Sequence, residues 1–255
     1  MEFKELQARL DGFTFHTSIG PRRGKILYDA IRESAPSDCL ELGFAHGTSS
    51  CYIAAALDEV GSGHLTSVDM VSGTEWQDPS IEDLLRATGL EDYVTVQREN
   101  TSYTWFLKKK IEERSSNHGC EPLYDFCFID GAKNWTIDGC AFFLVDKLLK
   151  PGGRILFDDL KYTYQGPKER GALDSIDNID LVSMGEDELR TPHVDAIFQL
   201  LVMQHPDYSE FLVQDDWWAW ARKVRSAEKT LVLDETTTLR AEVVRTLRRL
   251  RKRSR

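Results

Sequence analysis

The 255-residue sequence predicts an α/β fold, built on a mostly parallel sheet with helices on both faces. Three observations lead to this prediction. Short apolar runs alternate with segments of helical period throughout the first 160 residues. Some of these runs end in acidic residues, as in YDFCFID and GGRILFDD, which is typical of buried strands whose carboxyl ends open onto a crevice. The last two runs are close enough to pair as an antiparallel hairpin.

The first 160 residues divide into strand and helix pairs. We expect strands at residues 38–43, 64–69, 93–97, 124–130 and 154–158. Helices are expected between them, at residues 48–57, 81–88, 102–113 and 135–149. Gly89 ends the second of these helices, and Lys150-Pro151-Gly152-Gly153 is a strong stop after the last.

The alternation breaks after residue 160. Residues 160–191 are polar and irregular, which indicates a mobile lid or a surface insertion. A helix at 192–203 and a hairpin of strands at 208–213 and 217–222 follow. The hairpin brings the expected sheet to seven strands, so the predicted fold is Rossmann-like, mostly parallel, and closed by an antiparallel pair. We expect residues 1–225 to form one domain and residues 226–255 to form a basic amphipathic tail.

The composition is that of an ordinary globular protein. Hydrophobic residues make up 41% and charged residues 29% of the chain, and no apolar run approaches the ~20 residues that span a bilayer. The N-terminal segment lacks the positive-then-apolar order of a signal peptide, so we expect a cytoplasmic location. Five cysteines without a CxxC pair argue against a disulfide framework or a zinc site.

Charge is unevenly distributed along the chain. The net charge is −10, but residues 240–255 hold eight Arg/Lys and one Glu, so the rest of the chain carries −17. A body this acidic repels phosphate backbones, which makes nucleic acid a poor candidate partner. The basic tail could fold against the acidic body or against a second subunit, and Trp217, Trp218 and Trp220 favour packing in the core or in a homodimer over an aromatic wall for a substrate.

A glycine-containing loop, Glu41-Leu42-Gly43-Phe44-Ala45-His46-Gly47, separates the first strand from the first helix. Its glycines let the backbone turn tightly and approach a ligand, and the helix start supplies unpaired N–H groups. The spacing does not fit G-x-G-x-x-G, which disfavours a pyrophosphate cradle. Asp69 follows 22 residues after Gly47, where an acid commonly binds ribose hydroxyls. A nucleoside ligand without a pyrophosphate is therefore expected.

This loop resembles the E-x-G-x-x-x-G segment of class I S-adenosylmethionine methyltransferases. The resemblance implies that S-adenosylmethionine is the cofactor and that Glu41 orients the loop. It also implies a set of cofactor-binding residues: Gly43, Ala45, Gly47 and Ser49 on the methionine and ribose side, Asp69 at the ribose, Met70 beside adenine, Asn100 or Thr101 reaching adenine, and Asp130 bordering the cofactor.

The segment Asp130-Gly131-Ala132-Lys133-Asn134-Trp135 is similar to the D-x-x-K-x-[YW] segment of the catechol and caffeoyl-coenzyme A O-methyltransferases, a metal-dependent subgroup. Residues 19–27 are similar to the G-x-x-x-G-x-x-L segment that precedes the first strand in these enzymes. The resemblance implies that Asp130, Asp158 and Asp159 bind a metal and that Lys133 is the catalytic base. Three hard oxygen ligands suit Mg²⁺ or another divalent cation. Asn134 either orients the substrate or caps the following helix.

One geometric condition applies to Asp158 and Asp159. Neighbouring residues within a strand point to opposite faces of the sheet, so both can bind one cation only if the strand ends there.

The expected function is a metal-assisted, S-adenosylmethionine-dependent O-methyltransferase. It would act on a hydroxyl of a small molecule with vicinal oxygens, such as a catechol or a diol of a sugar or secondary metabolite. Two alternatives stay open at this point: a metal-independent N- or O-methyltransferase, and a non-catalytic binding protein with a methyltransferase fold.

Overall fold

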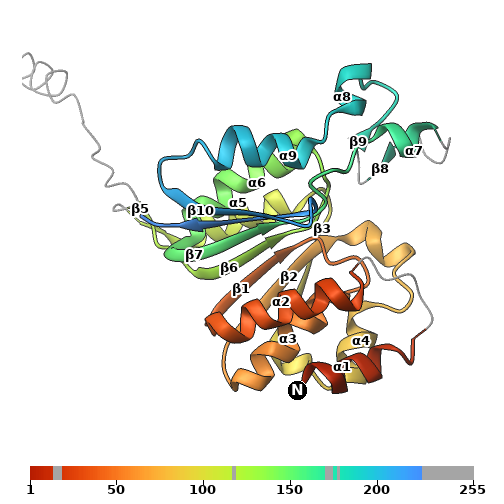
Figure 1. Ribbon diagram of the computed structural model, residues 1–255, viewed down its shortest axis with the longest axis vertical. Coiled ribbons are helices and arrows are strands. Elements are labelled where there is room, and N and C mark those ends of the chain that lie inside the picture. Colours follow the sequence, from red (N-terminus) through yellow and green to blue (C-terminus); the bar gives the residue numbers. More distant parts are fainter. Residues whose placement is uncertain (14–18, 117–118, 170–174, 177–178, 226–255) are drawn as a thin grey trace, which may run out of the picture. The chain divides into compact units, whose positions relative to one another are not determined.

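The computed structural model describes residues 1–13, 19–116, 119–169, 175–176 and 179–225 (Figure 1). The predicted basic tail at residues 226–255 lies outside the described residues, and so does part of the expected insertion. No helix of the described chain is both long enough and apolar enough to cross a bilayer.

Seven strands form the main sheet, in the order β10-β11-β7-β6-β1-β2-β3 (Figure 1). Their bounds are Asp38–Leu42 (β1), His64–Met70 (β2), Val94–Glu99 (β3), Tyr124–Ile129 (β6), Leu149–Phe157 (β7), Tyr208–Gln214 (β10) and Trp218–Lys223 (β11). The strands from β3 to β7 pair in parallel, and β11 is antiparallel to both of its neighbours, β7 and β10. The predicted fold class is confirmed.

The order of the strands reverses at the centre of the sheet. From β1 the chain moves outward to β2 and β3, and it then returns to β6 and β7 on the other side of β1. In open α/β sheets, ligands bind at such a switch point, outside the carboxyl ends of the strands. The boundary between β1 and β6 is therefore where a binding site is expected.

Helices cover both faces of the sheet (Figure 1). One face packs against α1 (Phe3–Leu10), α2 (Pro21–Ser34), α3 (Thr48–Val60) and α4 (Ile81–Thr88). The other packs against α5 (Tyr103–Arg114), α6 (Trp135–Leu148), and α9 (His193–Ile197) with its π-helical continuation η3 (Phe198–Val202). Side chains of β1 alternate between the two cores, since Cys39 belongs to the first and Leu40 to the second.

Two N-terminal helices were not predicted. In α1 and α2 the buried apolar residues recur four positions apart, at Leu6 and Leu10 and at Leu27 and Ile31. This period is a helical signal that the sequence does contain. Together these helices complete the core on the face of the sheet that α3 and α4 also cover.

The start of β7 also differs from the prediction. The strand begins at Leu149, before the expected stop, and the register with β6 jumps from Tyr124↔Leu149 to Phe126↔Arg154. Lys150 to Gly153 therefore form an irregularity within the strand and not a loop before it.

The remaining short elements are η1 (Val71–Glu75), η2 (Glu91–Tyr93), β4 (Ser115–Ser116), β5 (Gly119–Cys120), α7 (Gln165–Glu169), β8 (Ser175–Ile176), β9 (Ile179–Asp180) and α8 (Glu186–Arg190). Several lie in the expected insertion at residues 160–191. The described part of that stretch is not only a surface insertion, because several of its apolar side chains are buried in the core. They include Leu160, Tyr164, Leu181, Met184 and Leu189.

The hairpin turn between β10 and β11 matters for the site. Asp215 and Asp216 have φ angles of 56° and 55°, and the Trp217 N–H donates to the Gln214 carbonyl at 3.1 Å. Left-handed residues at both central positions match the right-handed twist of the flanking strands, and aspartate tolerates this conformation. The turn sets the register in which Ala219 pairs with Phe157 at the end of β7.

Candidate active site

The glycine loop and the loop after β6, residues 130–134, meet at the switch point of the sheet. Gly43 has a φ of 90°, and a Cβ at this position would lie 2.5 Å from the Gly131 Cα. Gly47 has a φ of 92°, and its Cβ would lie 2.4 Å from the Ile81 Cγ1. Only glycine accommodates both the positive φ and the close approach. The predicted tight turn is therefore present, and it brings the end of β1 against the end of β6.

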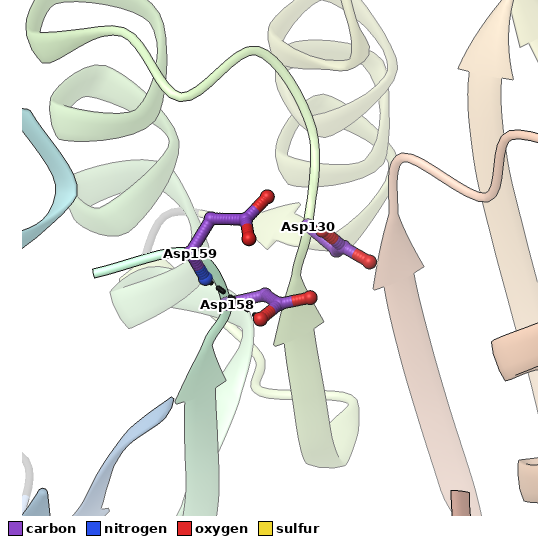
Figure 2. A group of neighbouring side chains, drawn as sticks. All are labelled: Asp130, Asp158 and Asp159. Atoms are coloured by element: carbon purple, nitrogen blue, oxygen red, sulfur yellow. Dashed lines mark hydrogen bonds between the residues drawn. The ribbon is translucent and has the colours of Figure 1, made fainter. Parts of the chain in front are cut away.

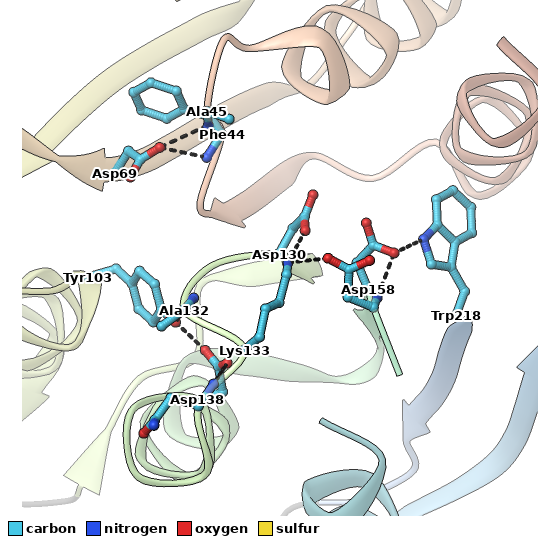
Figure 3. Close-up of polar contacts among 12 residues, drawn as sticks. Phe44, Ala45, Asp69, Tyr103, Asp130, Ala132, Lys133, Asp138, Asp158 and Trp218 are labelled. Carbon is cyan, nitrogen blue, oxygen red and sulfur yellow. Dashed lines mark hydrogen bonds and ion pairs between the residues drawn. The ribbon is translucent and has the colours of Figure 1, made fainter. Parts of the chain in front are cut away.

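Asp69 braces the glycine loop from the end of β2 (Figure 3). Its Oδ2 accepts the N–H groups of Phe44 at 3.1 Å and Ala45 at 2.9 Å, and its Oδ1 accepts the Met70 N–H at 2.7 Å. Burial raises the pKa of Asp69, and these hydrogen bonds oppose that shift. Asp69 thus shapes the loop, and its contact with ribose stays a prediction.

Glu41, at the start of the glycine loop, is a buried hydrogen-bond acceptor. It is fully buried, and the hydroxyls of Ser50 on α3 and Ser67 on β2 both donate to its Oε2. Burial raises the pKa of Glu41, while the hydrogen bonds from serines lower it. One carboxylate therefore joins β1, α3 and β2, which supports its predicted orienting role.

Two adjoining hollows lie at this edge of the sheet, and both are lined by Gly43, Ala45, Asp130 and Gly131. The first, of about 110 Å³, is also lined by Asp69, Met70, Trp76 and Thr101. The second, of about 160 Å³, is also lined by Thr48, Ser49, Lys133 and Asp159. A larger hollow of about 440 Å³ lies between α2 and the β10–β11 pair, and none of the sequence-predicted site residues lines it.

Most of the predicted cofactor-binding residues thus line these two adjoining hollows. Gly47 is an exception, because it caps α3 behind the loop. Asn100 is exposed and lines neither hollow, whereas its neighbour Thr101 lines the first. Trp76 was not predicted; its ring lies 5.4 Å from that of His46. A lone tryptophan after the second strand carries no recognisable signal in the sequence.

Three carboxylates converge beside the glycine loop (Figure 2). Asp130 follows β6, and Asp158 and Asp159 follow β7, which ends at Phe157. Asp159 has a φ of 58°, so the chain leaves its extended path at this residue and the geometric condition on the pair is met. One oxygen from each carboxylate lies within 4.8 Å of the others.

Lys133 lies among these carboxylates. Its Nζ forms a hydrogen-bonded ion pair with Asp130 and lies 3.3 Å from the Asp159 Oδ2. Burial would lower the pKa of Lys133, but the charges of Asp130, Asp159 and Asp158 outweigh it and raise the pKa above its usual value. In this arrangement the amine is protonated.

Burial raises the pKa values of Asp130 and Asp158, and the charge of Lys133 opposes both shifts. With every group ionised, three carboxylates and one ammonium carry a charge of −2 in a largely buried site. A buried net charge of this size is unfavourable without a counter-ion.

The donor set fits a divalent cation. Carboxylate oxygens are the ligands that Mg²⁺ and Ca²⁺ prefer, at 2.0–2.6 Å, so two ligands of one ion lie at most about 5 Å apart. The 4.8 Å limit on the three oxygens is compatible with this span. One divalent charge would also neutralise the −2 of the ionised cluster.

The loop from Asp130 to Asn134 is held by a second network (Figure 3). The Tyr103 hydroxyl donates to Asp138 and accepts the Ala132 N–H at 3.1 Å, and the Tyr164 hydroxyl donates to the Ala132 carbonyl at 2.5 Å. A Cβ at Gly131 would lie 2.2 Å from the Tyr103 ring. These contacts hold the loop in its observed conformation. Neither tyrosine was predicted as a site residue.

Asn134 begins α6. Its Oδ1 accepts the N–H groups of Thr136 at 2.8 Å and Ile137 at 3.1 Å. Of its two predicted roles, the structure shows the helix cap, and substrate contact stays a prediction.

Trp218 was predicted as a packing residue, and the structure also brings it to the site. Together with Trp220 it packs in the core as expected, but its Nε1 also donates to the Asp158 Oδ1 at 2.7 Å (Figure 3). This contact depends on the pairing of β11 with β7, which local sequence does not reveal.

Comparison with known proteins agrees with this geometry. Residues 40–160 match a family model described as a methyltransferase domain. No curated protein matches the chain.

Several solved structures have a similar fold. An O-methyltransferase from Bacillus cereus in complex with S-adenosylhomocysteine has a TM-score of 0.56 and 20% identity, covering 86% of this chain and 89% of that one. A candidate caffeoyl-CoA O-methyltransferase from Staphylococcus aureus has a TM-score of 0.58 and 18% identity, covering 88% and 92%. The O-methyltransferase TomG from Streptomyces achromogenes, in complex with S-adenosylmethionine, has a TM-score of 0.54 and 16% identity, covering 88% and 89%.

The matched segment begins within β1 and ends three residues after β7, so it includes the glycine loop, Asp69, Asp130 and the Asp158–Asp159 pair. The resemblance seen in the sequence is therefore confirmed: the chain contains a methyltransferase domain and has the fold of S-adenosylmethionine-dependent O-methyltransferases.

Proposed function

We propose that this protein is a divalent-cation-assisted O-methyltransferase that transfers the methyl group of S-adenosylmethionine to a small molecule with adjacent oxygens. One observation carries the proposal. The glycine loop and part of the acidic cluster, which we define as Asp130, Asp158 and Asp159, line the same hollow: Ala45 and Ser49 border it together with Asp130 and Asp159. A methyl donor on the loop and an oxygen nucleophile at the carboxylates would therefore be neighbours.

The proposed cofactor site uses residues of both hollows. Gly43, Ala45 and Ser49 would contact the methionine and ribose, with Gly47 at the helix start behind them. Asp69, Met70 and Thr101 would contact the adenosine, and Asn100 would have to reach it from the exposed side. S-adenosylmethionine supplies the electrophilic methyl group.

The proposed cation site consists of Asp130, Asp158 and Asp159. A bound divalent cation lowers the pKa of a coordinated hydroxyl and orients its oxygen. The chain's own contribution is to hold three carboxylate oxygens within 4.8 Å of one another, two of them on residues that line the hollow beside the glycine loop, Asp130 and Asp159.

Lys133 is proposed as the group that takes the proton of the substrate hydroxyl. Its pKa is raised while the carboxylates surround it alone, so it can act as a base only when another cation shares those carboxylates. This condition links the base to the cation.

A methyl-transfer screen tests the proposal. The protein is first treated with EDTA and then incubated with S-adenosylmethionine and either catechols or vicinal diols. Mg²⁺ or Mn²⁺ is afterwards added back to the reaction. We expect transfer to vanish with EDTA and to return with the cation. Transfer that is equally fast in EDTA contradicts the cation mechanism.

A metal-independent methyltransferase is the second candidate, and the ion pairs of Lys133 favour it. The ammonium already offsets part of the charge of Asp130 and Asp159. In that case Asp130→Asn would keep most of the activity, whereas the cation mechanism expects a loss of at least about 100-fold, the cost of removing a key electrostatic contact.

A further inference from the structure

We propose that Trp218 is a positioning residue that holds Asp158 in the orientation in which only its Oδ2 is presented to the cation. This inference rests on the proposed cation site. It concerns a side chain from β11, outside the methyltransferase domain match at residues 40–160.

Two donors share one oxygen of Asp158. The Trp218 Nε1 and the Asp159 N–H each donate to Oδ1 at 2.7 Å. A carboxylate oxygen offers about two lone-pair positions. Oδ1 is therefore fully used within the protein, and Oδ2 is the oxygen left for a ligand bond.

The indole is well suited to this task. It can donate but not accept, so it distinguishes the two ends of any side chain that it contacts. Trp218 is 1% exposed, and its ring lies in edge-on contact with Phe128 at 6.1 Å and Trp220 at 6.1 Å. Its donor therefore has little freedom to follow a rotating carboxylate.

Asp158 needs such a restraint because it lies at the end of β7 beside two other carboxylates. Repulsion from Asp130 and Asp159 favours rotating it away. The fixed donor opposes this rotation before a cation arrives, which is the general action of hydrogen bonds to metal ligands.

Trp220 provides a matched control. It lies on the same strand, belongs to the same core cluster and is 9% exposed, but its Nε1 donates to the Gln214 Oε1 at 3.1 Å. Trp218→Phe and Trp220→Phe thus remove the same group from one core, and only the first removes a donor to the acidic cluster.

The first test is calorimetric titration of the purified full chain with Mn²⁺, beside titration with S-adenosylhomocysteine. We expect Trp218→Phe to raise the Kd for Mn²⁺ about tenfold or more. Trp220→Phe should change it less than about twofold, and both variants should bind S-adenosylhomocysteine as the wild type does. Equal Mn²⁺ affinity in the two variants overturns the inference. A wild type that binds no Mn²⁺ overturns the cation site as well, so the two failures are distinguishable.

A second test does not depend on how the Phe variant folds. In Asp158→Asn, the fixed indole N–H would retain the amide oxygen and turn the amide NH₂ toward the cation. We therefore expect Asp158→Asn to bind Mn²⁺ as weakly as Asp158→Ala. An Asn variant that binds at least tenfold more tightly than the Ala variant shows that residue 158 rotates freely, which contradicts the inference.

Discussion

At the scale of single residues, the site is defined by what each acidic side chain accepts. Asp69 accepts N–H groups from the glycine loop, and Asp158 accepts an indole and a backbone N–H. Asp130 and Asp159 instead face the Lys133 ammonium, with which a bound cation would have to share these two carboxylates. Residue type alone could not separate these roles, because all four are aspartates at the ends of strands.

Glu41 leads to a prediction about pH. Its raised pKa in the folded state means that its ionisation costs stability above the unfolded pKa of about 4.3. The wild type should therefore lose stability relative to Glu41→Gln as the pH rises from about 4 through the folded pKa. Urea unfolding of both proteins at several pH values measures the difference.

Glu91→Gln is the control for this experiment, because it removes an exposed carboxylate. Its stability should follow that of the wild type across the same pH range. A Glu41→Gln difference that stays flat with pH would mean that Glu41 does not titrate differently in the folded and unfolded states.

At the scale of elements, the loops after β1 and β6 are rigid because their neighbours leave one conformation for each. Gly43 and Gly131 permit the close approach of the two loops. The side chains of Tyr103, Tyr164 and Asp138 form hydrogen bonds with the backbone of the second loop. The start of α6 belongs to the same unit, since Asn134 follows the proposed base directly in the chain.

The role of Asn134, as helix cap or as substrate-orienting residue, can be decided by substitution. Asn134→Ala should lower the free energy of unfolding by about 1 kcal/mol, because two N–H groups lose their acceptor. Asn134→Ser keeps a capping oxygen and should retain both stability and activity. Urea unfolding and methyl-transfer rates measure the two effects, and a Ser variant that is stable but inactive would instead assign the amide to the substrate.

Local signals predicted the central elements well. Gly89 and the β1–α3 glycines mark boundaries that the structure reproduces, and α4 has the expected bounds of residues 81–88. The stop at Lys150 to Gly153 was misplaced, because a proline and glycines can lie within an irregular strand as well as in a loop. Local sequence does not distinguish the two cases without the partner strand.

At the scale of the whole molecule, the order of the strands creates the site. The reversal between β1 and β6 places two loops and the end of β7 at one edge, so the three aspartates predicted from separate runs do meet. The contact of Trp218 with Asp158 could not be predicted, because it requires β11 to insert between β7 and β10 in a particular register. Pairing between distant strands is the information that a single sequence hides.

Stoichiometric Mn²⁺ binding tests the central claim most directly. Electron paramagnetic resonance counts the Mn²⁺ ions bound to the full chain in the presence of S-adenosylhomocysteine. We predict one tightly bound ion per chain, lost in Asp130→Asn, because one of its three carboxylates is then gone. A wild type without a bound ion, or an Asp130→Asn variant that binds it equally well, would contradict the account.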